Sequence, residues 1–133
     1  MVVVPSMTGA KNKHLIDSLS ALEKIIMSEE TVNYILKHRN HKVAAKIVRD
    51  IRLLNGSGLD LPEDYIHRIW ASKEKLWALR TRFSNNTERT LFFVVHEGKF
   101  LLTNCFRKDT KEIPENQIRK AEKVLHEYLK SMG

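Results

Sequence analysis

Three segments in the first half of the chain carry apolar residues at every third or fourth position, with Lys, Arg, Asp and Glu between them. This spacing is the period of an amphipathic helix. It predicts helices over residues 14–27, 31–38 and 41–54. A further short helical element is expected to start at Asp60, because Glu63 stands three residues later in capping-box spacing. We expect Trp70 to help dock this element on the core.

From Leu76 onward the apolar period changes to two, which is typical of strands with one buried face. Strands are predicted over residues 76–83, 89–96 and 99–106. Their short connections favour an antiparallel meander. The helical period returns over residues 114–130. The pattern therefore predicts an α+β fold, in which a small antiparallel sheet packs against N-terminal helices and a C-terminal helix.

The chain has 133 residues, and no linker, repeat or change of composition divides it, so residues 1–133 are expected to form one domain. The start, Met1 to Pro5, lacks the basic region of a secretory signal, and no segment approaches the roughly 20 apolar residues of a membrane span. We therefore expect a cytoplasmic protein that makes no membrane contact. Cys105 is the single cysteine, which excludes an intramolecular disulfide.

Lys and Arg number 23 and Asp and Glu number 16, which gives a formal net charge of +7. Such an excess indicates a polyanionic partner, such as nucleic acid, the ribosome, an acidic protein or an anionic membrane. Solvated helix faces also account for a surplus of Lys. The position of the charges is therefore more informative than their number.

Two arginines on one strand give the most specific chemical signal. Arg80 and Arg82 are two residues apart and so project from the same face. Arg89 opens the next strand, and Lys108 and Lys111 follow the third, so a meander would bring these cations together laterally. Arg matches phosphate oxygens with a planar fork of donors, and crowding among cations helps a Lys to lose its proton. A solvated strand face is the alternative interpretation.

Other catalytic chemistries find little support in the sequence. There is no Gly-rich phosphate loop, and no Ser or Cys stands in a nucleophile elbow. The six His residues are scattered, and the pair His38 and His41 lacks a third ligand at metal-binding spacing. We therefore expect neither a metal nor a cofactor.

The strand segments resemble a known family when they are taken in order. Leu76–Phe83 is similar to the strand motif of the phage-derived HigB-like branch of the RelE/ParE toxin superfamily. Arg89–Phe93 resembles its next strand, and Phe106–Pro114 resembles the segment before its last helix. Val43–Gly58 is similar to the helix that precedes the sheet. The resemblance covers roughly residues 31–130, so residues 1–30 would be an N-terminal extension or extra helix.

The resemblance implies a RelE-like sheet of three to four strands, with Val2 to Val4 as the possible fourth. It implies the toxin of a type II toxin–antitoxin pair that cleaves mRNA on the ribosome without a metal, through attack of the 2′-hydroxyl on the adjacent phosphodiester. Carried over by motif position, the catalytic residues would be Arg80, Arg82, Arg89 and Lys108. Arg107, Thr110 and Lys111 would help to bind the RNA.

The implied partners are mRNA on the ribosome, a helix-turn-helix (HigA-like) antitoxin and, through that antitoxin, operator DNA. Residues 14–27 are a candidate antitoxin contact. Two alternatives stay open. A module that binds RNA or the ribosome without cutting is favoured by Glu88 and Asn104, which stand where the family often has Tyr and His. A gyrase-directed toxin of the ParE type is the other.

Overall fold

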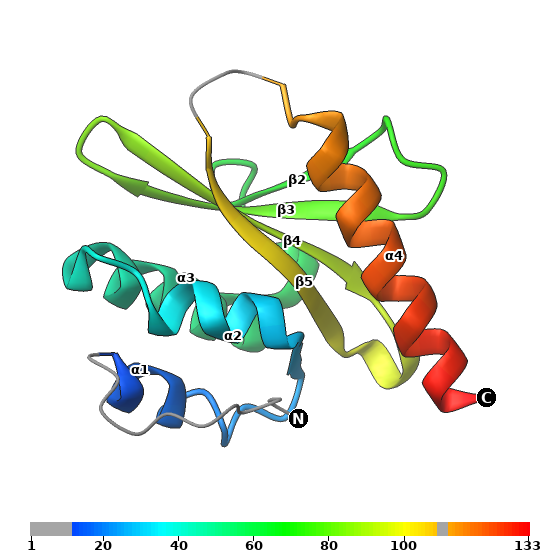
Figure 1. The fold of residues 1–133 in the computed structure, drawn as a ribbon, viewed down its shortest axis with the longest axis horizontal. Coiled ribbons are helices and arrows are strands. Elements are labelled where there is room, and N and C mark those ends of the chain that lie inside the picture. The colour runs from blue at the N-terminus through cyan, green and yellow to red at the C-terminus, as the bar shows by residue number, and fades with distance from the viewer. Residues whose placement is uncertain (1–11, 109–111) are drawn as a thin grey trace.

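The computed structural model describes residues 12–108 and 112–133, which form a mixed sheet with helices on both faces (Figure 1). The described helices are α1 (Lys13–Asp17), α2 (Glu29–Leu36), α3 (His41–Ser57) and α4 (Glu115–Met132), with 3-10 turns at Gly58–Asp60 and His96–Gly98. The described strands are β1 (Ile25–Met27), β2 (Ile66–Ile69), β3 (Leu76–Phe83), β4 (Asn86–Val94) and β5 (Phe100–Lys108). The α+β class is therefore confirmed.

The sheet has five strands in the order β1-β5-β4-β3-β2, so the prediction of three to four strands was wrong. The meander of β3, β4 and β5 is antiparallel as predicted, but β1 pairs with β5 in parallel and makes the sheet mixed. β2 adds an antiparallel edge strand beside β3. Both additional strands have only three or four residues, too few to reveal a period of two.

The helix predicted over residues 14–27 does not form. Only α1, with five residues, is helical there, and Ile25 to Met27 belong to β1. All three residues of β1 are buried, because Ile25 and Met27 pack on one side of the sheet and Ile26 packs on the other. A run of apolar residues buried on both faces has no strand-like alternation, so the sequence could not distinguish it from a helix.

The helical element expected after Asp60 is also absent. Asp60 ends a 3-10 turn, the backbone turns over Pro62, and the chain continues as β2. Ile66 and Ile69 are buried, but Trp70 is 78% exposed, so the expected docking of Trp70 was wrong.

The remaining helices form close to their predicted bounds, for reasons visible in their ends. The Ser28 hydroxyl accepts a hydrogen bond from the Thr31 backbone N–H and caps α2, and Asn40 caps α3 in the same way. α4 begins directly after Pro114, which occupies the N-cap position and whose carbonyl accepts a hydrogen bond from the Gln117 backbone N–H.

Two apolar cores lie on opposite faces of the sheet. One is formed by α1, α2 and α3 with Leu79, Phe92 and Leu102, and it includes the buried free thiol of Cys105. The other lies beneath α4 and contains Ala78, Leu91 and Phe106. Every strand of the meander therefore presents alternate residues to α3 or to α4, and this alternation decides where each polar side chain points.

Candidate functional site

Four cations lie on the sheet face that carries α4. Leu76 and Ala78 on this face of β3 belong to the core under α4, and Arg80 and Arg82 follow them toward the other end of the strand. Arg80 lies opposite Arg89 of β4, so the two guanidinium groups are direct cross-strand neighbours. Thr87 of β4 lies between Arg82 and Lys108. We call Arg80, Arg82, Arg89 and Lys108 the cation cluster.

Arg89 is the most constrained member of the cation cluster, because it is only 7% exposed. Among the described residues, its Nε and Nη1 have no hydrogen-bond partner and no ion pair includes it. Burial, together with the charges of Arg80 and Arg82, lowers the pKa of Arg89 to about 10. A guanidinium held in this way remains protonated at neutral pH and lacks a counter-charge among the described residues.

Lys108 is 8% exposed and lies next to Arg89 and Arg80. Burial first, and then these two charges, lower the pKa of Lys108, while Glu112 opposes the shift. An ammonium with a lowered pKa gives up its proton more readily than an ordinary surface lysine.

His67 completes the arrangement from the edge strand β2. It lies opposite Ala78, and its Nδ1 is 3.3 Å from Nη2 of Arg80. Arginine can only donate, so Nδ1 accepts and the neutral ring carries its proton on Nε2. Burial, followed by the charges of Arg80, Arg89 and Lys108, lowers the pKa of His67 to about 4. The sequence did not reveal this residue, because β2 was expected to be helical.

The neutrality of His67 predicts a stability change in acid. Its pKa falls from 6.5 in the unfolded chain to about 4 in the fold, so the unfolded state binds more protons between these values. Stability is present above pH 6.5 and is lost as the pH falls toward 4. Because the side chain is partly solvated, we expect a loss of about 1–2 kcal/mol. Urea unfolding at pH 7 and pH 4.5 should show this loss in the wild type and a smaller one in His67→Gln. Equal losses of stability in the wild type and in His67→Gln would contradict this role of His67.

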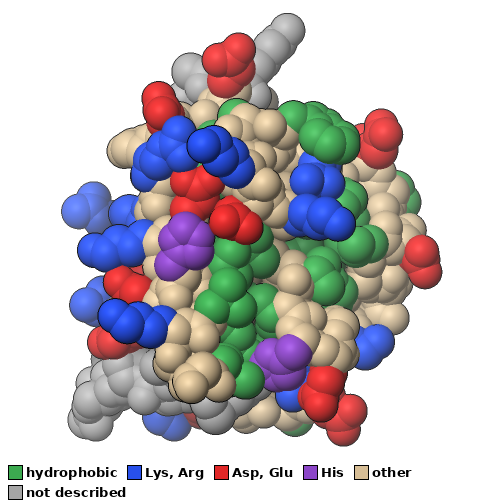
Figure 2. All heavy atoms as spheres, turned by 90° about the vertical axis from the view of Figure 1, so that its right-hand side faces the viewer, with side chains coloured by type: hydrophobic (Ala, Val, Ile, Leu, Met, Phe, Trp, Pro, Cys, Tyr) green, Lys and Arg blue, Asp and Glu red, His purple; other side chains and the backbone are tan. Residues whose placement is uncertain are grey.

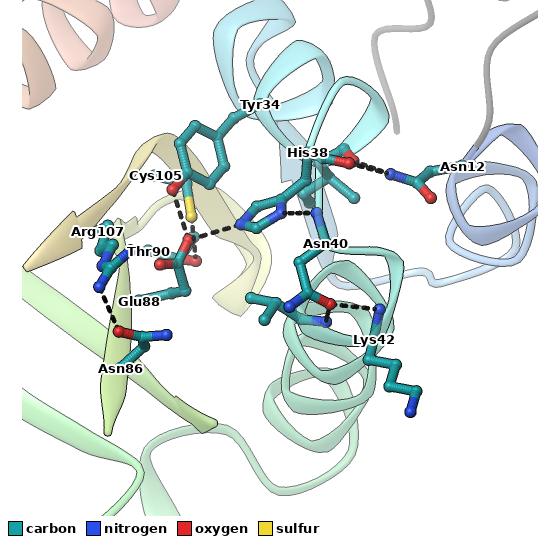
Figure 3. Close-up of polar contacts among 12 residues, drawn as sticks. Asn12, Tyr34, His38, Asn40, Lys42, Asn86, Glu88, Thr90, Cys105 and Arg107 are labelled. Atoms are coloured by element: carbon teal, nitrogen blue, oxygen red, sulfur yellow. Dashed lines mark hydrogen bonds and ion pairs between the residues drawn. The ribbon is translucent and has the colours of Figure 1, made fainter. Parts of the chain in front are cut away.

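Glu88, the residue before Arg89, points to the opposite face of the sheet (Figure 3). It is 2% exposed, accepts hydrogen bonds from the Tyr34 hydroxyl and from His38 Nε2, and is held away from the cation cluster. The Asn40 backbone N–H donates to His38 Nδ1 and so fixes this ring orientation. Burial and the bond to Glu88 raise the pKa of Tyr34. The carboxylate therefore neither pairs with Arg89 nor faces a ligand bound there.

Arg107 also lies on this second face, apart from the cation cluster. Its Nη2 donates to Oδ1 of Asn86, and it lines a cavity of about 780 Å³ together with Tyr34, Glu88 and Cys105 (Figure 3). Arg107, which the resemblance assigns to RNA binding, therefore lies on the opposite face of the sheet from the cation cluster. Thr110 and Lys111, the other two residues expected to bind RNA, lie outside the described residues.

Asn104 is buried and ties β5 to α4. Its Nδ2 donates to the backbone oxygen and to Oε1 of Gln117, and its Oδ1 accepts from the Thr103 hydroxyl. These bonds use the polar atoms of the amide, so it is not free to contact a ligand. Asn104 instead fixes the start of α4 over the sheet.

Elsewhere the positive charge is spread out. Figure 2 shows Lys and Arg side chains interspersed with Asp and Glu around a central band of hydrophobic side chains. On that side of the molecule, the mixture is typical of a solvated surface. The net charge alone therefore does not mark the site, whereas the buried position of Arg89 does.

Within residues 12–108 and 112–133, no group of three or more His, Cys, Asp and Glu side chains is arranged to hold a metal ion. None of the helices in this part of the chain has the length and apolar character needed to cross a membrane.

Comparison with models of known protein families gives a match. The model of the family described as phage-derived protein Gp49-like (DUF891) matches residues 35–126, which is more than half of the chain. The match includes β2, β3, β4 and β5, and thus every residue of the cation cluster. No curated protein matches the chain.

Proposed function

Since this chain belongs to the phage-derived Gp49-like family, a toxin-like family of the RelE/HigB type, we propose that it is a HigB-like toxin of a type II toxin–antitoxin pair. In this proposal it cleaves mRNA on the ribosome without a metal and so inhibits translation. The observation that carries the proposal is the cation cluster, in which Arg89 is buried beside Arg80 and Arg82 without a carboxylate partner among the described residues.

A phosphodiester is the group that this cluster fits best. Burying a guanidinium without a counter-charge is costly, and a bound anion would remove that cost. Arg80 and Arg89 are cross-strand neighbours, so a phosphate bound beside them is attracted by both guanidinium charges. Arg82 lies two residues beyond Arg80 on β3, and Lys108 lies at the same level of the sheet on β5. A neighbouring phosphate of the same RNA molecule would pass this position. The cluster therefore suits a phosphate chain rather than a single small anion.

The reaction follows from the same groups. The 2′-oxygen of the RNA loses its proton and forms a bond to the adjacent phosphorus, the bond from phosphorus to the 5′-oxygen breaks, and that oxygen gains a proton. The products are a 2′,3′-cyclic phosphate and a 5′-hydroxyl. Arg80 and Arg89 stabilise the charge that grows on the phosphorane oxygens. Lys108 exchanges a proton with the reacting oxygens. His67 donates a hydrogen bond from its Nε2–H to the bound RNA.

The proposal includes the partners of such a toxin. A helix-turn-helix antitoxin of the HigA type binds and silences it in the cytoplasm, and the pair represses its own operator. Residues 14–27 remain a candidate antitoxin contact, formed by α1 and the segment leading to β1 rather than by one helix. Co-purification with the product of a neighbouring gene tests the partnership, and a gene of another class at that place counts against it.

Expression of the chain without its antitoxin tests the activity. We expect growth to stop within one or two generations and primer extension to show new 5′ ends inside translated mRNAs. The same cuts should be missing in untranslated transcripts, since the proposed substrate lies on the ribosome. Normal growth with intact mRNA would contradict the proposal. DNA damage without mRNA cuts would indicate a gyrase-directed toxin instead.

A non-cleaving module is a second candidate, and one observation favours it. Asn104 stands where the family often has His, and its amide is used to hold Gln117. Glu88 no longer favours this candidate, because it lies on the other face of the sheet. A non-cleaving module would arrest translation while mRNA stays whole, and its affinity for RNA would fall as salt rises.

A further inference from the structure

Trp70 is the most exposed large hydrophobic residue among those described, at 78%. It follows the edge strand β2 directly, whereas Ile69 beside it is buried in the core under α4. An exposed indole gains almost none of the free energy that burial of its large apolar surface would give. Trp70 lines the same groove as Arg80 of the cation cluster, so its exposure calls for an explanation beyond folding.

Arg68 holds Trp70 in a defined arrangement. The Arg68 guanidinium carbon lies 4.5 Å from the centre of the Trp70 ring and 5.9 Å from the centre of the Trp77 ring. Its Nε is buried and has no hydrogen-bond partner within the described chain. Arginine in this position orients an indole by cation–π contact and leaves part of the ring open.

A groove of about 620 Å³ connects these residues with the cation cluster. His67 and Arg80 line one part of it, and Arg68, Trp70 and Trp77 line another. Because β2 is the edge strand, residues from both of its faces reach the same groove. Arg68 lies opposite Trp77, three residues from Arg80 along β3, which corresponds to about 10 Å. Trp70 lies two residues beyond Arg68, so a base that reaches it belongs to a nucleotide further along the strand than the one whose phosphate Arg80 holds.

We propose that Arg68 and Trp70 form a stacking site for a base of single-stranded RNA whose phosphate is held at the cation cluster. The inference rests on the function proposed above and adds a base-binding subsite to it. Aromatic rings beside a cationic track are the usual means of holding single strands, because every base offers a flat face. Glu63 and Asp64 also line the groove, and these carboxylates disfavour a second phosphate there. The groove therefore suits a base rather than more backbone.

The chain has two tryptophans, which makes a direct measurement possible. In a Trp77→Phe background, Trp70 is the single reporter of indole fluorescence. We titrate this protein with a short single-stranded RNA and with an abasic oligonucleotide of equal length and charge. We expect the RNA to quench Trp70 strongly and the abasic strand to quench it little, since only a base can stack on the ring.

Affinity measurements separate the base from the phosphate. Trp70→Ala should lower the affinity for RNA about tenfold and leave the affinity for the abasic strand unchanged. Trp70→Phe should retain most of the affinity, and Arg89→Ala should lower the affinity for both strands. The exposed position of Trp70 leaves the core intact in these variants.

Each other outcome overturns a defined part of the account. If Trp70→Ala binds RNA like the wild type while Arg89→Ala does not, the stacking site is wrong and the proposed function stands. If Trp70→Ala loses only its antitoxin, the exposed indole belongs to a protein interface and the inference is wrong. If neither strand binds and Arg89→Ala changes nothing, the proposed function fails, and the stacking site fails with it.

Discussion

Replacing Arg89 by Ala is expected to reduce the rate of mRNA cleavage by about 100-fold or more, the usual cost of removing a preorganised charge donor from a transition state. Arg89 is central to the cation cluster, because Arg80 lies directly opposite it. In addition to burial, the charges of Arg80 and Arg82 lower the pKa of Arg89, and the charge of Arg89 in turn lowers the pKa of Lys108. Single-turnover cleavage of a messenger programmed on purified ribosomes would measure this effect. Arg107→Ala is the matched control, because it removes an arginine from the opposite face of the same strand pair.

Two results would contradict this assignment. Equal loss of cleavage in the Arg107 and Arg89 variants would mean that overall charge matters rather than the cluster. Full cleavage by Arg89→Ala would place the reacting phosphate elsewhere. Loss of fold is not expected to obscure the result. Arg89 is a buried charge without an ion-pair partner among the described residues, so its removal should leave stability unchanged or raise it by about 1 kcal/mol. Thermal unfolding of the variant would verify this.

Replacing Glu88 by Ala is expected to lower the free energy of unfolding by about 3 kcal/mol. The change removes a buried carboxylate and leaves the Tyr34 hydroxyl and His38 Nε2 without their common acceptor. Glu88→Gln keeps an acceptor oxygen in nearly the same place and should cost less. Urea unfolding at pH 7 measures both variants, with Glu115→Ala as the control for loss of an exposed carboxylate.

The same variants test which face Glu88 serves. Because its side chain points away from Arg89, folded Glu88→Gln should bind RNA with wild-type affinity. A marked rise in affinity would show that the carboxylate opposes the RNA, as its place beside Arg89 in the sequence first suggested. A stability loss below about 0.5 kcal/mol in Glu88→Ala, as for an ordinary surface residue, would contradict the buried network.

The meander and the long helices could be predicted because their patterns extend over eight or more residues. The alternation within β3 correctly placed Arg80 and Arg82 on one face. The same alternation predicts the orientation of Arg107. Arg107 and Lys108 are adjacent on one strand, so their side chains point to opposite faces of the sheet. That conclusion required the strand to extend to Lys108, two residues beyond its predicted end.

The short strands could not be predicted in the same way. β1 is buried on both faces and has no polar alternation, and the buried residues of β2, Ile66 and Ile69, stand three apart as in a helix. Both segments become strands because they pair with the sheet, and not because of their local conformational preference. His67 and Arg68 belong to β2. Their part in the site could not be predicted, because the hydrophobic pattern did not predict this strand.

The salt dependence of RNA binding tests the central claim most directly, because it counts the phosphates that the protein neutralises. For a single strand, the slope of log affinity against log salt falls by about 0.7 for each phosphate contact. We expect Arg89→Ala to reduce the slope by roughly this amount and Arg107→Ala to leave it unchanged. Identical slopes for the wild type and Arg89→Ala would show that Arg89 does not hold the RNA backbone.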